Sequence, residues 1–137
     1  MRKVLVILFV SLFLFSSAAI AADYRVTKSW MKVGESAYSI FEVSPETFIK
    51  IDQGRCTVWA RVTYKKYPDN KEHIKFISSY GANKSLCFDT VKTDMGSTYK
   101  YSPPRCLDIT KKHSMAEEIW ISIAVIYAAE EAKNIQK

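Results

Sequence analysis

Cysteine and histidine are the side chains of this sequence best suited to covalent chemistry. Cys106 with His113, and Cys87 with His73, would each supply the thiol and imidazole of a nucleophilic pair. An active thiol needs a lowered pKa and a free sulfur. The export signal described below instead predicts an oxidising compartment, in which neighbouring cysteines are joined. We therefore expect no thiol enzyme.

Other catalytic patterns do not occur in the sequence. The two histidines lie in no H-x-x-x-H spacing and near no paired cysteines, so we expect no metal site. The four glycines stand singly, which leaves no phosphate-binding loop, and no G-x-S-x-G nucleophile elbow is present. Glu117 and Glu118 begin a predicted helix, where their charge suits the helix dipole. We expect a protein that is not an enzyme and needs no cofactor.

Exposed aromatic and basic side chains are the remaining candidates for function. Trp59 and Arg61 share one face of a predicted strand, and Trp and Arg dominate the binding energy of protein interfaces. Lys65, Lys66 and Tyr67 follow at the next turn. We predict these five as binding residues. In the alternative arrangement Trp59 packs under the helix, and the other face of the strand meets a different layer.

The first residues predict export. Arg2 and Lys3 precede an apolar run from Val4 to Phe15, and Ala19-Ile20-Ala21 is an A-x-A cleavage signal. We expect residues 1–21 to be a signal peptide and 22–137 a single α+β envelope domain, periplasmic or secreted. The alternative is an uncleaved anchor, because Val4 to Ala22 carries no charge. No cysteine lies near the cleavage point, so we expect no lipid attachment.

Composition narrows the class of partner. Removing residues 1–21 removes two basic residues and no acidic one, which takes the formal net charge from +6 to +4. This mild excess is too small for a dedicated nucleic-acid binder, so we expect no nucleic-acid partner. We expect contact with a membrane only through the signal peptide before its cleavage, and a host or envelope protein as partner. The oligomeric state is left open.

Three cysteines allow three pairings of one disulfide. We favour Cys87 with Cys106, because they flank the turn-rich stretch 94–104, whereas Cys56 falls on the apolar face of a strand. Closing this loop would stabilise the fold by roughly 3 kcal/mol. The remaining thiol also allows a disulfide-linked dimer.

Alternation of apolar and polar residues predicts an antiparallel sheet of about five or six strands. The clearest strand is 55–64, with Cys56, Val58, Ala60 and Val62 on one face. We also expect an edge strand over 23–33 that ends before Gly34, and strands over 37–43, 73–80 and 85–91. Residues 65–71 are predicted as a polar turn, and 97–101 as a last strand ended by Pro103 and Pro104. Residues 44–47 fit either a short helical turn or a bend, with an extended segment over 47–51.

The end of the chain changes to a helical pattern. Ser114 and Glu117 form a capping box, in which each side chain accepts a hydrogen bond from the other's backbone. Ile119, Trp120 and Ile123 then begin an apolar face of about five turns. An apolar face of this size must be buried against another element, and the predicted sheet is the candidate. We therefore expect an α+β fold, a sheet packed against a C-terminal helix.

The segment from Gly54 to Lys66 resembles the V-x-V-W-V … Y-K strand and turn of bacterial surface adhesins of the protein E type. Ser85 to Asp89 is similar to that family's cysteine-bearing strand. The resemblance implies a curved antiparallel sheet, a helix tethered to it by the disulfide, and binding of host matrix proteins. The chain differs in lacking the lipid-attachment cysteine and in carrying Cys56.

Together these features predict an exported, non-enzymatic binding module of the bacterial envelope with adhesin-like protein–protein interaction. The alternative is a periplasmic inhibitor or immunity-type protein, in which one loop or the aromatic face plugs the cleft of an enzyme.

Overall fold

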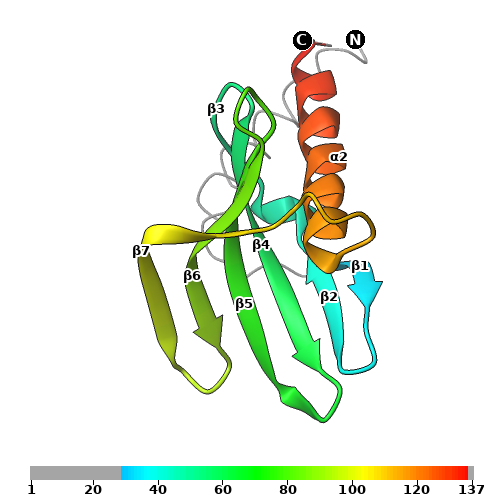
Figure 1. Cartoon of the computed structure of the whole chain (residues 1–137), viewed down its shortest axis with the longest axis vertical. Helices are drawn as coiled ribbons and strands as arrows, with labels where there is room; N and C mark the ends of the chain where they lie inside the picture. The colour runs from blue at the N-terminus through cyan, green and yellow to red at the C-terminus, as the bar shows by residue number, and fades with distance from the viewer. Residues whose placement is uncertain (1–28, 136–137) are drawn as a thin grey trace, which may run out of the picture.

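The structure is a computed structural model that describes residues 29–135. The predicted signal peptide therefore lies outside the described residues. Within them an antiparallel sheet packs against one long helix (Figure 1), which confirms the α+β prediction. The elements are β1 (Met31–Glu35), β2 (Ser39–Val43), η2 (Pro45–Thr47), β3 (Ile49–Asp52), β4 (Arg55–Tyr64), β5 (Tyr67–Ser79), β6 (Ser85–Thr93), β7 (Thr98–Leu107) and α2 (Met115–Ile135).

The sheet has seven strands, one more than the upper expectation. Its order is β1-β2-β4-β5-β6-β7, and β3 also pairs with β4. The extra strand arises because β2 and β3 pair with opposite halves of β4, as Val43 opposite Ala60 and Ile49 opposite Thr57 show. Between β2 and β3, where the sequence fits either a short helical turn or a bend, the chain forms the 3-10 turn η2.

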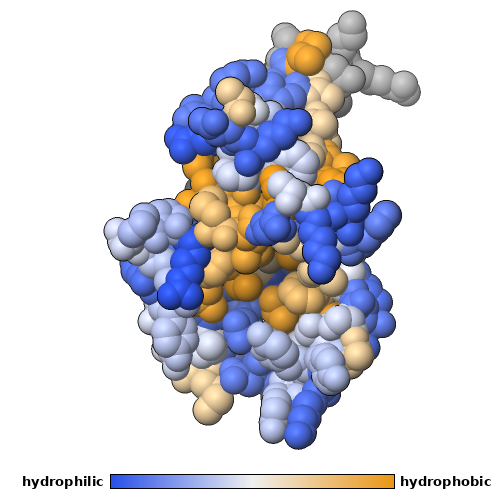
Figure 2. Space-filling view, viewed as in Figure 1, coloured by the Kyte–Doolittle hydropathy of each residue, from blue (hydrophilic) through white to orange (hydrophobic). Residues whose placement is uncertain are grey.

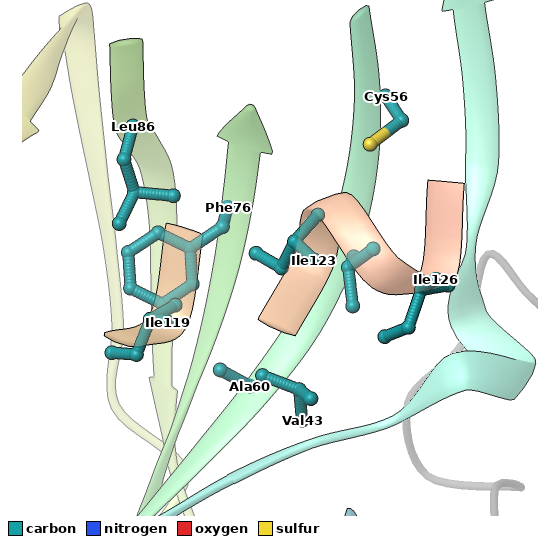
Figure 3. Packing of buried hydrophobic residues seen from close by; sticks show 9 residues of the cluster. Val43, Cys56, Ala60, Phe76, Leu86, Ile119, Ile123 and Ile126 are labelled. Carbon is teal, nitrogen blue, oxygen red and sulfur yellow. The ribbon is translucent and has the colours of Figure 1, made fainter. Parts of the chain in front are cut away.

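β4 lies at the centre of the sheet and has the predicted bounds. Cys56, Val58 and Ala60 on one of its faces are buried, and they form the core together with isoleucines of α2. Figure 3 shows Ile119, Ile123 and Ile126 pointing from α2 toward these strands. Their burial against the sheet is the main apolar contact of the fold.

The predicted turn over 65–71 is wrong. The turn contains only Lys65 and Lys66, and β5 begins at Tyr67. Tyr64 pairs with Tyr67 while Val62 pairs with Glu72, so residues 68–71 form a bulge opposite one residue of β4. Pro68 lies in this bulge, where the missing N–H breaks no regular ladder bond.

The last strand also passes through prolines that were expected to end it. β7 continues to Leu107, and Thr90 pairs with Lys100 while Phe88 pairs with Arg105. Pro103 and Pro104 therefore lie in a bulge of an edge strand, which tolerates them.

The first described strand starts and ends later than expected. Residues 23–28 lie outside the described part of the chain, and β1 includes Gly34. A Cβ atom at Gly34 would lie 2.9 Å from Glu118 Oε2 and 3.0 Å from Met115 Cε. Glycine at this position therefore allows the first turn of α2 to pack directly on β1.

One of the two hydrogen bonds of the predicted capping box forms at the start of α2, and the other goes to a neighbouring residue. Ser114 Oγ accepts a hydrogen bond from the Glu117 amide at 3.2 Å, as expected. Glu117 Oε1 accepts from the His113 amide at 2.9 Å, one residue earlier than the predicted Ser114 amide. His113 has a φ of 63°, a left-handed conformation that ends the preceding turn.

The predicted pair Cys87–Cys106 forms the disulfide, and Cys56 is buried and reduced. The two bonded residues face each other on β6 and β7. The expectation that this bond braces the sheet to the helix is therefore wrong, because it joins two neighbouring strands. The apolar packing of α2 on the sheet is joined instead by hydrogen bonds: Tyr80 Oη donates to the Trp120 carbonyl at 2.6 Å, and the Gly54 amide donates to Tyr127 Oη at 2.8 Å.

Candidate binding site

Trp59 lies on the face of β4 that points away from α2. Only 5% of it is exposed, and the Lys92 ammonium lies 5.9 Å from the centre of its ring. The expectation of an exposed tryptophan is therefore wrong. The alternative is wrong as well, because α2 covers the opposite face, which carries Cys56 and Val58. Trp59 is buried, and it presents little surface to a partner.

Arg61 is held by contacts within the protein. Its Nε donates a hydrogen bond to Glu42 Oε1 at 3.0 Å, and Glu42 lies directly opposite Arg61 on β2. Its guanidinium also stacks on Trp30, 4.5 Å from the ring centre. The arginine is thus part of the sheet surface, where its charge is already paired.

The other three predicted residues lie together at one end of the sheet. The turn between β4 and β5 meets the turn between β1 and β2, and both lie at the end farther from the C-terminus (Figure 1). A hollow of about 420 Å³ opens between them. We call it the tyrosine–lysine hollow, and it is lined by Ala37, Tyr38, Tyr64, Lys65, Lys66 and Tyr67.

Backbone hydrogen bonds fix the two turns relative to each other. The Lys65 amide donates to the Tyr38 carbonyl at 2.9 Å. Ser36 Oγ accepts from the amides of Tyr38 at 3.2 Å and Ser39 at 3.1 Å, which shapes the β1–β2 turn. The side chains around the hollow are therefore presented from an ordered frame.

The tyrosines expose much of their rings although their backbones are fixed. Tyr38 is 81% exposed, Tyr67 63% and Tyr64 38%. Partial burial raises the pKa of the Tyr64 hydroxyl, and a hydrogen bond with Glu72 acts in the same direction. This phenol is therefore neutral at physiological pH, and its proton is donated to the Glu72 carboxylate.

The two lysines differ in their surroundings. Lys65 Nζ lies 3.5 Å from Glu35 Oε1, a carboxylate that Lys32 also approaches at 3.5 Å. These two cations, Lys32 foremost, lower the pKa of Glu35. Lys66 Nζ instead lies 5.8 Å from the centre of the Tyr67 ring. The hollow therefore combines aromatic surface with the charge of Lys66 at its rim, whereas the charge of Lys65 is shared with Glu35.

The thiols and histidines considered above for catalysis lie elsewhere. Cys87 and Cys106 are bonded to each other. Burial raises the pKa of the Cys56 thiol to about 12, which keeps it protonated. His73 is buried beside Trp30, with Nδ1 3.6 Å from Asp94 Oδ1. Within residues 29–135, no group of three His, Cys, Asp or Glu side chains is placed to hold a metal ion.

Sequence reasoning missed Ala37, Tyr38 and Tyr64 as members of the hollow. Alternation from Cys56 puts Tyr64 on the core face of its strand, and the predicted strand 37–43 includes Tyr38, whereas β2 begins only at Ser39. The signal that could have found them is the hairpin register. Tyr64 pairs with Ser39 on one side and with Tyr67 on the other, which gathers three tyrosines at one end of the sheet.

Comparisons of the chain with protein-family models, curated proteins and solved structures found no match. The resemblance to surface adhesins of the protein E type therefore stays a prediction.

Proposed function

We propose that this protein is an exported, non-enzymatic binding module of the bacterial envelope, and that the tyrosine–lysine hollow contacts a protein partner. The observation that carries the proposal is the convergence of Tyr38, Tyr64 and Tyr67 with two lysines on two hydrogen-bonded turns. Three of the five predicted binding residues belong to this hollow.

The chemistry of the hollow suits a protein surface that carries acidic groups. Tyrosine offers a large, rigid, amphipathic contact with few torsions to order, and lysine adds long-range attraction to carboxylates. Because the turns are already fixed, binding orders few groups, which lowers its entropic cost.

The disulfide supports the assignment to the envelope. A bond between Cys87 and Cys106 is typical of proteins in an oxidising compartment. Within residues 29–135, no helix is long and apolar enough to cross a membrane. The predicted signal peptide would deliver the domain to the periplasm or the exterior.

The test compares variants of the mature chain in two binding assays, one with immobilised extracellular-matrix proteins and one with envelope extract of the native host. Tyr38→Ser with Tyr67→Ser should abolish the capture of any partner that the wild type enriches. Tyr99→Ser is the matched control, because Tyr99 is 53% exposed on β7. Equal capture by wild type and the double variant, or no enrichment by the wild type in either assay, would contradict the proposal.

A second candidate, an inhibitor of an envelope enzyme, is favoured by the projection of the β4–β5 hairpin. Its two-residue turn presents Lys65 and Lys66 at the end of the sheet (Figure 1), a shape that fits into a cleft. If this reading is right, wild type will inhibit an envelope hydrolase and Lys65→Ala with Lys66→Ala will not. Capture without inhibition supports the binding module instead.

A further inference from the structure

The outward face of α2 carries an apolar stripe that the fold does not use. We call it the outer stripe, and its residues are Ile121, Val125, Ala128, Ala132 and Ile135. All five are exposed, and the largest of them strongly so: Ile121 48%, Val125 63% and Ile135 83%. In Figure 2 hydrophobic atoms reach the surface over α2 near its C-terminal end as well as between α2 and the sheet.

The spacing of the outer stripe distinguishes it from scattered surface residues. Successive members are four, three, four and three residues apart, which is the a and d repeat of paired helices. The buried isoleucines of α2 lie on a different face of the helix, against the sheet. The helix is therefore apolar on two sides, and a monomer buries only one of them.

We propose that the outer stripe packs against the outer stripe of a second copy of this chain, with the two helices antiparallel. In an antiparallel pair the a positions of one helix face the d positions of the other. A two-fold axis between Val125 and Ala128 then places Val125 on Ala128 of the second copy. The same axis places Ile121 on Ala132. Both of these layers join one large and one small side chain, so residues 121–132 are complementary to themselves, and Ile135 lies at the end of the contact, opposite Glu118 of the second copy.

Charge favours a second copy over a lipid surface as the occupant. No residue of the outer stripe is charged, and its neighbours Ser122 and Ala129 are small and uncharged as well. The charged residues of α2 are Glu117, Glu118, Glu130, Glu131 and Lys133. A helix with four acidic residues and one basic residue is repelled by anionic headgroups, whereas surface-bound helices are rich in Lys and Arg.

The size of the stripe sets the strength of the pair. Its five residues span 15 positions, and the first and last are about 21 Å apart along the helix. A contact along one pair of helices of this length is smaller than the standard interface of roughly 1,600 Å². The two-fold pair should therefore be weak, with a dissociation constant on the order of 100 µM.

Pairing would also affect how a partner is bound. The tyrosine–lysine hollow lies at the end of the sheet farther from the C-terminus of α2 (Figure 1). Antiparallel helices therefore place the two hollows at opposite ends of the dimer. Such a dimer can bridge two ligands, and on a surface with repeated ligands it gains avidity without any new contact.

Disulfide trapping of the mature chain tests the arrangement of the pair. Ile121→Cys and Ala132→Cys proteins should each remain monomeric under mild oxidation and should cross-link rapidly when mixed. A parallel pair would instead cross-link each variant with itself, and that result would overturn the proposal. Cys56 gives no background because it is fully buried, and the native disulfide occupies the other two cysteines.

Sedimentation velocity without cross-linking tests the affinity. The sedimentation coefficient of the wild type should rise over about 10 µM to 1 mM, and Val125→Glu should remain monomeric at all concentrations. Met95→Glu is the matched control, because Met95 is 81% exposed in the β6–β7 turn, and it should behave as wild type. A wild type that stays monomeric at 1 mM, or a Val125→Glu protein that associates normally, would contradict the proposal.

Discussion

At the scale of single residues, Thr47 explains how the sheet tolerates the break between β2 and β3. Its hydroxyl donates to the Ser44 carbonyl at 2.7 Å and accepts from the Trp59 amide at 2.9 Å. The Ser44 amide in turn donates to the Trp59 carbonyl at 3.0 Å. One side chain therefore supplies the acceptor that a continuous strand would have offered to β4.

Thr47→Val should show how much the Thr47 hydroxyl contributes to the free energy of unfolding. Valine keeps the shape of the side chain, but in a site that is 1% exposed it leaves the Trp59 amide without its acceptor and removes one of the two hydrogen bonds that the Ser44 carbonyl accepts from residue 47. We expect a loss of about 1–3 kcal/mol in the free energy of unfolding, measured by denaturant titration. Thr47→Ser keeps the hydroxyl and should lose less. A valine variant more stable than the serine variant would show that the hydrogen bonds contribute little.

The buried His73 should make stability depend on pH. Burial is the main cause that lowers its pKa, with Arg61 and Lys71 acting in the same direction and Asp94 opposing them. The unfolded chain therefore takes up a proton at a higher pH than the folded chain. Stability attributable to His73 is present above its unfolded pKa of about 6.5 and falls as the pH drops from there toward the lower folded value.

The measurement is the free energy of unfolding between about pH 7 and pH 5 for wild type and His73→Gln. The wild type should lose stability over this range, and the variant should lose less. An identical slope for the two proteins would contradict this account of His73.

At the scale of elements, the contact between α2 and the sheet depends on side chains more than on the helix cap. Trp120 Nε1 donates to the Ser79 carbonyl at 3.2 Å, and its ring centre lies 4.8 Å from that of Tyr80. Trp120→Ala should reduce the free energy of unfolding by about 3–5 kcal/mol. Ser114→Ala removes only the cap to Glu117 and should cost about 1 kcal/mol. Denaturant titrations that rank Ser114 above Trp120 would contradict this packing.

Element types were more predictable than element ends. The alternation of apolar and polar residues over 55–64 correctly predicted the bounds of β4. The Ser114 cap correctly predicted the start of α2. Both patterns depend only on residues close together in the sequence. The ends of β5 and β7 were wrong because a bulge places Pro68, Pro103 and Pro104 where a regular ladder would exclude them. A proline in sequence does not reveal whether its neighbours form a turn or a bulge, since both leave the missing N–H unused.

The candidate site shows the same division. Lys65, Lys66 and Tyr67 could be selected from sequence because they lie together at a turn. Trp59 was misjudged, because alternation identifies the two faces of a strand but not what covers each face. Lys92 and Lys75 come from other strands, and only the folded register brings them beside Trp59.

At the scale of the whole molecule, the two unused surfaces lie on different parts of the fold. The tyrosine–lysine hollow is at the end of the sheet formed by the β1–β2 and β4–β5 turns (Figure 1). The outer stripe runs along the exposed side of α2, away from the isoleucines that pack on the sheet. A partner in the hollow and a second copy on the helix therefore do not compete for the same residues. Binding through the hollow should persist in a Val125→Glu protein, although with lower avidity on a surface.

We propose that partners bind the molecule at the tyrosine–lysine hollow rather than on the face of the sheet that carries Trp59. Photo-crosslinking in living cells of the native host tests it most directly, with a photoreactive phenylalanine analogue placed at Tyr38, Tyr67, Arg61 or Tyr99 in separate proteins. We expect a shared covalent adduct at Tyr38 and Tyr67, and none at Arg61 or Tyr99. An adduct at Arg61 alone, or no adduct at Tyr38 and Tyr67, would contradict it.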